Sequence, residues 1–345
     1  MSRDDTRYGT GHDDGLTALT ALDPSATQTV DQLVRAMCHT AFGGRRLGEA
    51  ADVLEAMVRD PDCYRVLTIS GAMTIAKQGL LVCEMIDRGW VQAIVTTGAL
   101  MTHGLSEGVG MLHFKHRASM PDTELYEKGY NRVYDTIELE QNLDDVEKIL
   151  EPALDALPDD SVLSSRLITE RLGRYLERHT KGRAILKSAY QKQVPVFVPA
   201  FTDSELGLDV AIYNVKRAVK KGAALPFNPF IDLDDFTDRI RPRETLGIFT
   251  IGGGVPRNWA QQVGPYLDIR RKRLNIDEPL RRYKYAVRIC PEPDHWGGLS
   301  GCSYSEGVSW GKFVPESEGG RFAEVFADAT IAWPLVVRAV IERLS

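Results

Sequence analysis

The sequence predicts an α/β protein built around a mainly parallel sheet. Short apolar strands alternate with helical stretches, and several strands end in turns that carry glycine, threonine or aspartate. A strand, a glycine-bearing turn, a helix and a second strand in succession are typical of a βαβ unit. The chain has 345 residues, enough for one large domain, and no linker-like stretch divides it. We therefore expect a single domain over residues 29–345.

The first third of the chain shows the clearest alternation. Val30, Leu33, Val34 and Met37 recur at helical spacing, which indicates a helix that starts near Asp31. Periodicity then predicts a helix at 50–58, a strand at 65–69, a helix at 75–88 and a strand at 91–95. Residues 104–142 show no clear period, so we expect a loop-rich excursion with a short helix at 124–132.

The rest of the chain continues the alternation. Amphipathic patterns predict helices at 143–157, 164–178 and 210–221, and a final helix at 333–344. Short apolar runs predict strands at 194–200, 246–251, 285–289 and 323–327, the first of them flanked by prolines. Residues 1–28 are rich in Asp, Gly, Thr and Ser, and we expect a mobile N-terminal arm there or one that reaches a neighbouring subunit.

Composition narrows the class of function. The chain is 43% hydrophobic and 26% charged with a formal net charge of −6, which argues against a nucleic-acid-binding surface. Five scattered cysteines without a C-x-x-C pair favour a reducing compartment. No apolar run reaches the roughly 20 residues of a membrane span, and the N-terminal segment lacks a signal-like apolar core. We therefore expect a cytoplasmic protein with neither a nucleic-acid nor a membrane partner.

Several of the predicted strands end in residues that suit a ligand. Thr97-Gly98, Asp203, the glycines 252–254 and Asp328 all follow strands. Parallel sheets bind ligands at these carboxyl ends. The glycine run could place a nucleotide phosphate at a helix N-terminus or simply form a tight turn. Asp203 and Asp328 could bind ribose hydroxyls or a cationic substrate, or could cap helices. The G-x-G-x-x-G pattern is absent, which argues against the usual dinucleotide site.

The segment 305–313 holds a lysine that could act as a nucleophile. It reads Ser-Glu-Gly-Val-Ser-Trp-Gly-Lys-Phe, so in an extended backbone Glu306, Trp310 and Lys312 would share one face. An indole can hold an ammonium, and desolvation lowers the pKa of a lysine into the range needed for imine chemistry. The alternative is a surface loop with a solvated lysine.

Other catalytic constellations are missing from the sequence. His103, His113 and His116 have loop-like spacing, no carboxylate joins them at helical spacing, and H-E-x-x-H is absent, so we expect no metal site. Neither G-x-S-x-G nor a Walker motif occurs, which disfavours a serine hydrolase and a P-loop NTPase.

Taken together, the motifs resemble those of the deoxyhypusine synthase family. The resemblance runs from about residue 30 to the C-terminus, with all blocks in the family's order. They are Val95-Thr96-Thr97, Gly129-Tyr130-Asn131-Arg132, Pro199-Ala200-Phe201-Thr202-Asp203, Ile251-Gly252-Gly253-Gly254-Val255, Glu306-Gly307-Val308-Ser309-Trp310-Gly311-Lys312 and Ala327-Asp328-Ala329.

This resemblance implies an NAD-dependent transfer of an aminobutyl group from a polyamine such as spermidine to an acceptor amine. It also implies a Rossmann-like, doubly wound sheet with helices on both faces, and a homotetramer with active sites at subunit interfaces. The imine-forming lysine falls on Lys312. The family's NAD-contacting positions fall on Thr97, Gly98, Ala99, Asp203, Asp328 and Ala329, and its polyamine-contacting positions fall on Gly253, Asn258, Glu306 and Trp310.

The sequence departs from the family's pattern around this pocket. Asn258 stands where the family has a histidine, and Leu299 stands where it has an acidic residue. Met73-Thr74 replaces a Ser-Asn pair, and Thr102 replaces a glutamate. A further acidic position of the family falls on Leu208, and the next residue here is Asp209. We therefore place the chain in a divergent branch. Its acceptor is then either a free diamine such as putrescine, giving a homospermidine-type product, or a protein lysine, giving deoxyhypusine. Two alternatives are a catalytically silent polyamine- or nucleotide-binding relative with a regulatory or scaffolding role, and a polyamine oxidoreductase without transfer.

Overall fold

The central sheet is parallel and has six strands. The computed structural model describes residues 8–345, and the strands of this sheet lie in the order β6-β2-β1-β7-β8-β9. Their bounds are β1 (Cys63–Ile69), β2 (Ala93–Thr96), β6 (Val196–Phe197), β7 (Thr245–Ile251), β8 (Tyr283–Ile289) and β9 (Arg321–Val325). The chain adds strands outward on one side of β1 and then returns to β7 and continues outward on the other side. The predicted doubly wound sheet is therefore confirmed, with its switch point between β1 and β7.

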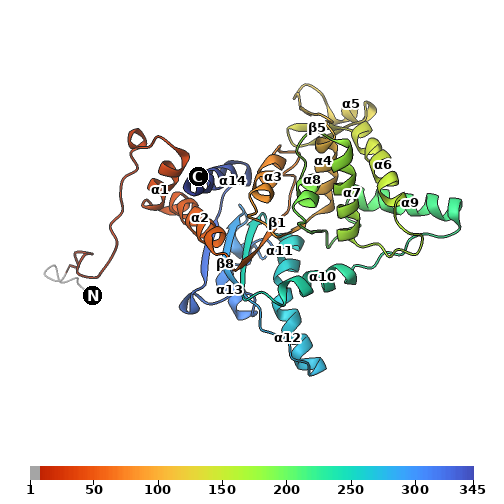
Figure 1. Cartoon of the computed structure of the whole chain (residues 1–345). Helices are drawn as coiled ribbons and strands as arrows, with labels where there is room; N and C mark the ends of the chain where they lie inside the picture. The colour runs from red at the N-terminus through yellow and green to blue at the C-terminus, as the bar shows by residue number, and fades with distance from the viewer. Residues whose placement is uncertain (1–7) are drawn as a thin grey trace.

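Helices cover both faces of the sheet (Figure 1). Along each strand, alternate residues belong to two separate apolar clusters, as the two-residue period of a strand requires. One face packs against α1 (Val30–Cys38), α2 (Phe42–Arg59), α3 (Gly79–Asp87) and α14 (Ala329–Leu344). The other packs against α10 (Phe230–Ile240), α11 (Gly254–Gln261), α12 (Val263–Leu274) and α13 (Tyr304–Ser309).

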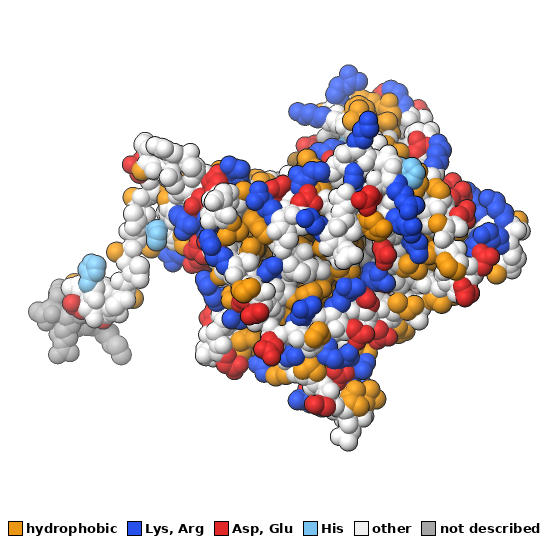
Figure 2. All heavy atoms as spheres, viewed as in Figure 1, with side chains coloured by type: hydrophobic (Ala, Val, Ile, Leu, Met, Phe, Trp, Pro, Cys, Tyr) orange, Lys and Arg blue, Asp and Glu red, His pale blue; other side chains and the backbone are white. Residues whose placement is uncertain are grey.

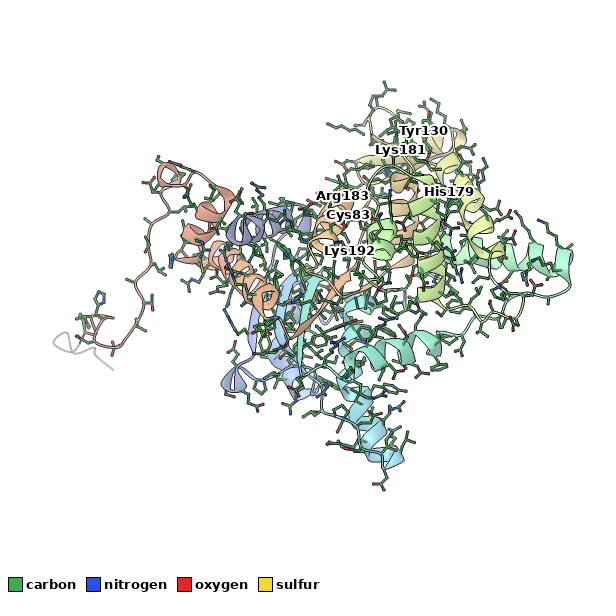
Figure 3. The ribbon with its side chains drawn as sticks, viewed as in Figure 1. Cys83, Tyr130, His179, Lys181, Arg183 and Lys192 are labelled. Carbon is green, nitrogen blue, oxygen red and sulfur yellow. The ribbon has the colours of Figure 1, made fainter. Side chains whose placement is uncertain are left out.

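A second group of helices lies beyond the β6 edge of the sheet (Figure 1). It contains α4 (Gly98–Gly108), α5 (Asp122–Glu127), α6 (Glu140–Asp155), α7 (Ser165–His179), α8 (Ile185–Gln191) and α9 (Glu205–Lys221). Figure 3 labels Arg183, in the α7–α8 loop, beside Cys83 of α3. The guanidinium of Arg183 pairs with Glu84 at 3.0 Å and with Asp87 at 2.8 Å, which ties this group to α3.

The segment predicted to be loop-rich is instead largely structured. Residues 98–139 hold α4, α5 and a small antiparallel sheet in the order β3-β5-β4, with β3 (His113–Lys115), β4 (Tyr130–Val133) and β5 (Thr136–Leu139). Strands this short carry too few residues for an alternating pattern to appear in the sequence. Their pairing depends on contacts between segments that are distant along the chain.

Other boundaries shifted for local reasons. The strand expected at 194–200 shrinks to Val196–Phe197, since the flanking Pro195 and Pro199 cannot donate to a neighbouring strand. The helix expected from residue 75 begins at Gly79. Thr29, rather than Asp31, caps α1 in a capping box with Gln32. Helix α11 follows the glycine run as expected, whereas α4, α8, α10, α12 and α13 were not predicted.

The N-terminal segment runs away from the body of the molecule (Figure 1). Within residues 8–28 the regular structure is a single 3-10 turn, Pro24–Ala26, and most side chains are exposed. The part of the predicted arm at residues 1–7 lies outside the described residues. The mobility of the arm stays a prediction.

The described surface carries charges of both signs. Figure 2 shows Lys and Arg interspersed with Asp and Glu over the visible face. None of the helices within residues 8–345 combines the length and apolar character that a membrane span needs.

Candidate active site

The strand ends named above meet at one edge of the sheet, since all six strands are parallel. At the switch point, Ser70 follows β1 and the glycine run follows β7. The backbone N–H of Gly253 donates to Oγ of Ser70 at 2.9 Å, and the N–H of Ser70 donates to the carbonyl of Ile251 at 3.0 Å. This edge between β1 and β7 is where an open α/β sheet offers its ligand crevice.

Four of the six predicted cofactor residues lie beside the end of β2. Thr97 caps α4, with its Oγ1 accepting the N–H of Leu100 at 3.3 Å. Gly98 is packed so tightly that an added Cβ would lie 1.9 Å from Oγ of Ser204. That contact places the exposed Asp203 next to the start of α4, whereas Ala99 faces solvent. Ser204, not Asp203, caps α9, so the carboxylate of Asp203 is not used as a helix cap.

The other two predicted cofactor residues lie across the sheet from this group. Asp328 follows β9 and caps α14, with its Oδ1 accepting the N–H of Thr330 at 2.8 Å. The capping alternative therefore holds for Asp328. Ala329 is the buried first residue of α14. Four strand spacings, about 19 Å, separate β2 from β9, so one compact ligand cannot touch both groups.

The predicted nucleophile and three of the four predicted polyamine residues line one cavity of about 300 Å³. Lys312 is 8% exposed, and its Nζ donates to Oδ1 of Asn258 at 3.1 Å. Leu299, at the position of a family acid, opens onto the same cavity. The full lining is Arg257, Asn258, Gln261, Gln262, Asp294, Gly297, Gly298, Leu299, Cys302, Glu306, Trp310 and Lys312.

The fourth predicted polyamine residue, Gly253, lies at the start of α11 and packs against the 291–303 loop. A Cβ at position 253 would lie 2.5 Å from Cα of Ser300. The close backbone approach requires glycine there whether or not a ligand is bound.

The backbone around Lys312 is not extended, as the shared-face argument assumed. Residues 304–309 form the short helix α13, Trp310 follows as its C-cap, and Gly311 turns the chain with φ of +70°. Glu306 and Trp310 still share a side because they are four residues apart on a helical turn. Within the described residues no cation–π contact joins Lys312 to Trp310, and Asn258 holds the ammonium instead.

Burial lowers the pKa of Lys312 below its ordinary value. The nearby guanidinium of Arg257 lowers it further, while Cys302 and Glu306 oppose the shift. No carboxylate among the described residues forms an ion pair with this ammonium, so little offsets its lost hydration. The neutral, nucleophilic amine is therefore favoured more than in a solvated lysine.

Two buried arginines that sequence reasoning missed shape this cavity. Arg257 is 2% exposed and donates to the carbonyl of Cys302 at 2.6 Å. Arg288 pairs with Glu324 at 3.0 Å and donates to the carbonyl of Ser300. Both guanidinia hold the 291–303 loop over the cavity. Neither arginine stands in a recognisable motif, so only the packing of α11 and β8 reveals them.

The substituted family positions near the β1 and β2 ends carry structural hydrogen bonds. Thr74 is buried and donates to the carbonyl of Leu100 at 3.2 Å. Thr102 is buried, donates to the carbonyl of Gly98 at 3.2 Å and accepts the N–H of Leu206 at 3.1 Å. Met73 packs partly buried against the core, and Leu208 is exposed. Here the lost polar groups are replaced by links between helices.

Comparison with known proteins identifies the family. The family model described as deoxyhypusine synthase matches residues 32–340. The chain is 32% identical over 317 residues to "Probable deoxyhypusine synthase 2" of Methanosarcina acetivorans, covering 92% of this chain and 88% of that protein. It is 30% identical over 309 residues to "Deoxyhypusine synthase-like protein" of Chlorobaculum parvum, covering 88% and 84%. The chain belongs to the deoxyhypusine synthase family.

A solved structure agrees at the level of the fold. A crystal structure of an Entamoeba histolytica protein assigned as a deoxyhypusine synthase superposes with a TM-score of 0.60 at 13% identity, covering 94% of this chain and 97% of that one. Membership of the family makes this chain a transferase of aminobutyl groups, with a polyamine donor and an amine acceptor. The resemblance seen in the sequence motifs is thereby confirmed.

Proposed function

We propose that this protein moves a four-carbon amine unit from a spermidine-like polyamine, through an imine on Lys312, to an acceptor amine, with NAD as a recycled cofactor. The observation that carries the proposal is the buried Lys312, whose amine has a lowered pKa and lines a cavity together with Glu306 and Trp310. A lysine desolvated in this way is suited to imine formation.

Features of the sheet edge support NAD as the cofactor. Oγ1 of Thr96 is buried at the end of β2 without a hydrogen-bond partner among the described residues. The N-termini of α4 and α11 meet this edge, and such termini attract phosphate. The exposed carboxylates of Asp203 and Asp328 suit ribose hydroxyls, and the span of about 19 Å between β2 and β9 suits an extended dinucleotide better than a small ligand. Thr97, Gly98, Ala99 and Ala329 complete the proposed contacts.

Bound NAD would supply the hydride chemistry: it would take a hydride from the carbon beside the donor's secondary amine, and the resulting NADH would return that hydride to the imine formed with the acceptor. Within the cavity, Glu306 would bind a terminal ammonium of the donor and Trp310 would cover its alkyl chain. Neutral Lys312 would attack the oxidised carbon, and the bond from that carbon to the donor nitrogen would break, releasing the smaller amine. The acceptor amine would then displace Lys312 and regenerate its free amine. Asn258 would hold Nζ in position between these two attacks.

Trapping the lysine adduct tests the proposal directly. The protein is incubated with NAD and spermidine, reduced with borohydride and digested, and the peptide that contains Lys312 is weighed. We expect a stable aminobutyl adduct on Lys312. Absence of any four-carbon adduct with spermidine, putrescine or agmatine would refute the transfer. NADH that accumulates without an adduct would favour the polyamine oxidoreductase, and binding without either signal would favour the silent relative.

The acceptor is a free diamine or a protein lysine, and a competition experiment separates the two. Spermidine labelled in its aminobutyl part is supplied with putrescine and with a lysine-bearing protein acceptor. Label in a homospermidine-type product identifies the diamine, whereas label on the protein identifies deoxyhypusine formation. Leu299 and Asn258, which remove a charge from the cavity, are the positions whose reversal we would test for a change of acceptor.

We also propose that the protein is a homotetramer. Leu208, Ile212, Val215 and Val219 recur along one side of α9 and are between 51% and 82% exposed, which leaves an uncovered apolar strip. Such a strip is typical of a subunit interface. Light scattering of the purified protein would report a mass near that of one chain if this proposal is wrong. A cytoplasmic location stays a prediction.

A further inference from the structure

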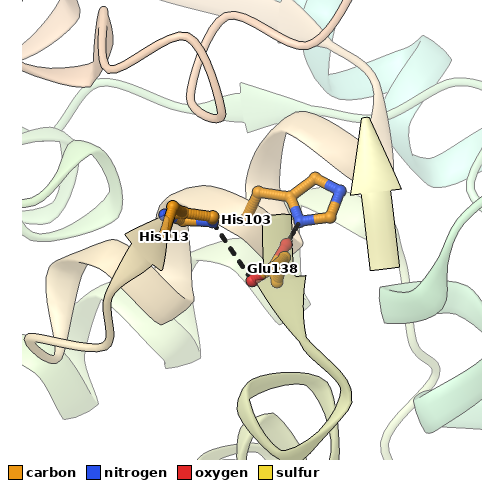
Figure 4. A group of neighbouring side chains, drawn as sticks. All are labelled: His103, His113 and Glu138. Atoms are coloured by element: carbon orange, nitrogen blue, oxygen red, sulfur yellow. Dashed lines mark ion pairs between the residues drawn. The ribbon is translucent and has the colours of Figure 1, made fainter. Parts of the chain in front are cut away.

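Two histidines and a glutamate form a compact cluster away from the Lys312 cavity. His103 lies on α4, His113 on β3 and Glu138 on β5, and their side chains converge (Figure 4). Nε2 of His113 is 3.2 Å from Oε1 of Glu138, and Nδ1 of His103 contacts Oε2 of the same carboxylate. One ligand atom from each of the three residues lies within 4.8 Å of the others.

This cluster contains a carboxylate that the sequence argument against a metal site did not find. The sequence argument looked for a carboxylate at helical spacing from His103, His113 and His116. The carboxylate comes instead from another strand, because β3 and β5 pair with His113 directly opposite Glu138. His116 does not join the cluster, and its Nε2 lies 3.3 Å from the carbonyl of Met120.

The cluster is buried, and its polar atoms are poorly satisfied. The side chains of His113 and Glu138 are each 1% exposed, and that of His103 is 18% exposed. Although the groups touch, their directions do not make hydrogen bonds: within the described residues Nδ1 of His103, Nε2 of His113 and both carboxylate oxygens lack a hydrogen-bond partner. The two imidazoles attract this carboxylate without well-directed hydrogen bonds, and a cation held between the three groups would neutralise it more completely.

The donor set suits a transition-metal ion. Two imidazole nitrogens and one carboxylate form a three-ligand set that binds Zn²⁺ and leaves a fourth position open. An ion about 2.1 Å from each tetrahedral ligand separates the ligand atoms by about 3.4 Å. The gap between His113 and Glu138 is already close to that value, so binding requires mainly that His103 draw back from Glu138. Its side chain is the most exposed of the three, so it has room to move.

Lys77 competes with a metal for His113. The Nζ of Lys77 lies 2.6 Å from Nδ1 of His113. In this arrangement the ammonium donates a hydrogen bond to Nδ1, and the ring hydrogen of the neutral imidazole is on Nε2. A metal on Nε2 requires the opposite tautomer, in which Nδ1 carries the hydrogen. Lys77 is 46% exposed and is also 3.5 Å from Glu107, so it can leave His113 for that carboxylate.

We propose that His103, His113 and Glu138 bind one divalent transition-metal ion, such as Zn²⁺, and that this ion clamps α4 to the small sheet. The site is independent of the proposed transfer chemistry, since it uses none of the residues that line the Lys312 cavity. Because Thr97 caps α4, the clamp also steadies the helix that begins at the ligand-binding edge of the main sheet.

Metal binding to the full-length protein tests the proposal. After treatment with a chelator and its removal, the protein is titrated with Zn²⁺ and, separately, with Co²⁺, whose visible absorption reports coordination by nitrogen and oxygen. We expect one ion per chain by elemental analysis, an intense Co²⁺ band of tetrahedral type, and a higher melting temperature with metal. Less than a stoichiometric amount of bound metal, or only the weak band of octahedral, water-like Co²⁺, would overturn the site.

Variants separate this site from adventitious binding. His103→Asn, His113→Asn and Glu138→Gln should each weaken binding about 100-fold or more, since removing a ligand exceeds the effect of removing an outer partner. His116→Asn, directly after β3, should leave affinity unchanged. Lys77→Met should tighten binding about tenfold by freeing Nδ1 of His113. If Glu138→Gln fails to fold, Lys77→Met at an exposed position still tests the proposal. Unchanged or weaker metal affinity in Lys77→Met would contradict the assignment. Equal metal affinity in His116→Asn and His113→Asn would contradict it as well.

Discussion

The Lys312 cavity and the His103–His113–Glu138 cluster both bury an ionisable group, yet the pKa shift favours the neutral form of Lys312 and the charged form of Glu138. The ammonium of Lys312 has a neutral amide as its partner, and its pKa falls. Burial by itself raises the pKa of Glu138, but the two imidazoles outweigh that effect and lower it to about 2. Removal from water destabilises the charged form of both groups, and the groups in contact determine whether the pKa shift favours the charged or the neutral form. The first region therefore favours a neutral amine and the second a carboxylate anion.

The sharpest difference between the two regions should appear on removing Lys312. Lys312→Ala should lower aminobutyl transfer by at least about 1,000-fold, because no other amine among residues 8–345 lines the cavity to form the imine. NAD binding, measured by calorimetry, should be unchanged. Lys312→Arg is the matched variant, since it keeps a cation that cannot become a neutral nucleophile. Transfer that survives in both variants would show that a different group carries the aminobutyl unit.

A substitution in the His103–His113–Glu138 cluster should change the stability of the fold and leave aminobutyl transfer largely unchanged. In metal-free protein, Glu138→Gln should lower the free energy of unfolding by about 2 kcal/mol, because it removes a buried anion in contact with two imidazoles. Urea unfolding measures the change, and Glu127→Gln on the exposed side of α5 serves as the control. Transfer per folded molecule should stay near that of the unchanged protein. A stability equal to that of the control variant would mean that the imidazoles do not hold the anion.

A carboxylate beside Lys312 should stabilise the charged form of the lysine, as the imidazoles stabilise the charged form of Glu138. Asn258→Asp should raise the pKa of Lys312, since an opposite charge favours the ammonium. Imine trapping depends on the neutral amine, so its rate rises with pH through that pKa and the profile should move to higher pH. Asn258→Ala removes the accepted hydrogen bond and should move the profile to lower pH. Borohydride trapping over a pH series gives both profiles, and shifts in the same direction would contradict this account.

Asp209 of α9 provides a third case, a carboxylate that faces acids. Burial, followed by Glu205, Glu147 and Asp144, raises its pKa from 3.8 to about 6, and its Oδ2 is buried without a hydrogen-bond partner among residues 8–345. The folded state therefore holds the proton more tightly than the unfolded state. Stability should fall as pH rises from about 4 to 6 and then stay lower.

Asp209→Asn should remove that penalty. We expect the variant to be more stable by about 1 kcal/mol at pH 8, after allowance for solvent screening, and equal to the unchanged protein near pH 4. Thermal unfolding at the two pH values measures the difference. Asp160→Asn, at an exposed position, should show no such pH dependence. A gain that is the same at both pH values would mean that the charge of Asp209 is not the cause.

Local patterns in the sequence determined much of the main sheet. All six of its strands, with β6 shorter than expected, and the helices α1, α2, α6, α7, α9 and α14 follow from periodicity, because a buried face imposes its period on the residues that form it. The glycine, threonine and aspartate residues after the strands were placed at one edge because parallel strands all end on the same side. Lys312 was singled out through its neighbours along the chain, Glu306 and Trp310, whose spacing suits a helical turn as well as a strand.

Only the tertiary structure decided what these residues touch. The contact between Lys312 and Asn258 joins α11 to the turn after α13, and no local pattern specifies it. The same holds for Arg257 and Arg288, which hold the 291–303 loop, and for Glu138, which reaches His113 through the register of β3 and β5. Side-chain period is a local property, whereas register and packing depend on the whole chain. The sequence by itself therefore singled out Lys312 as the candidate nucleophile. The fold set the proton affinity of that lysine and brought together a second cluster away from it.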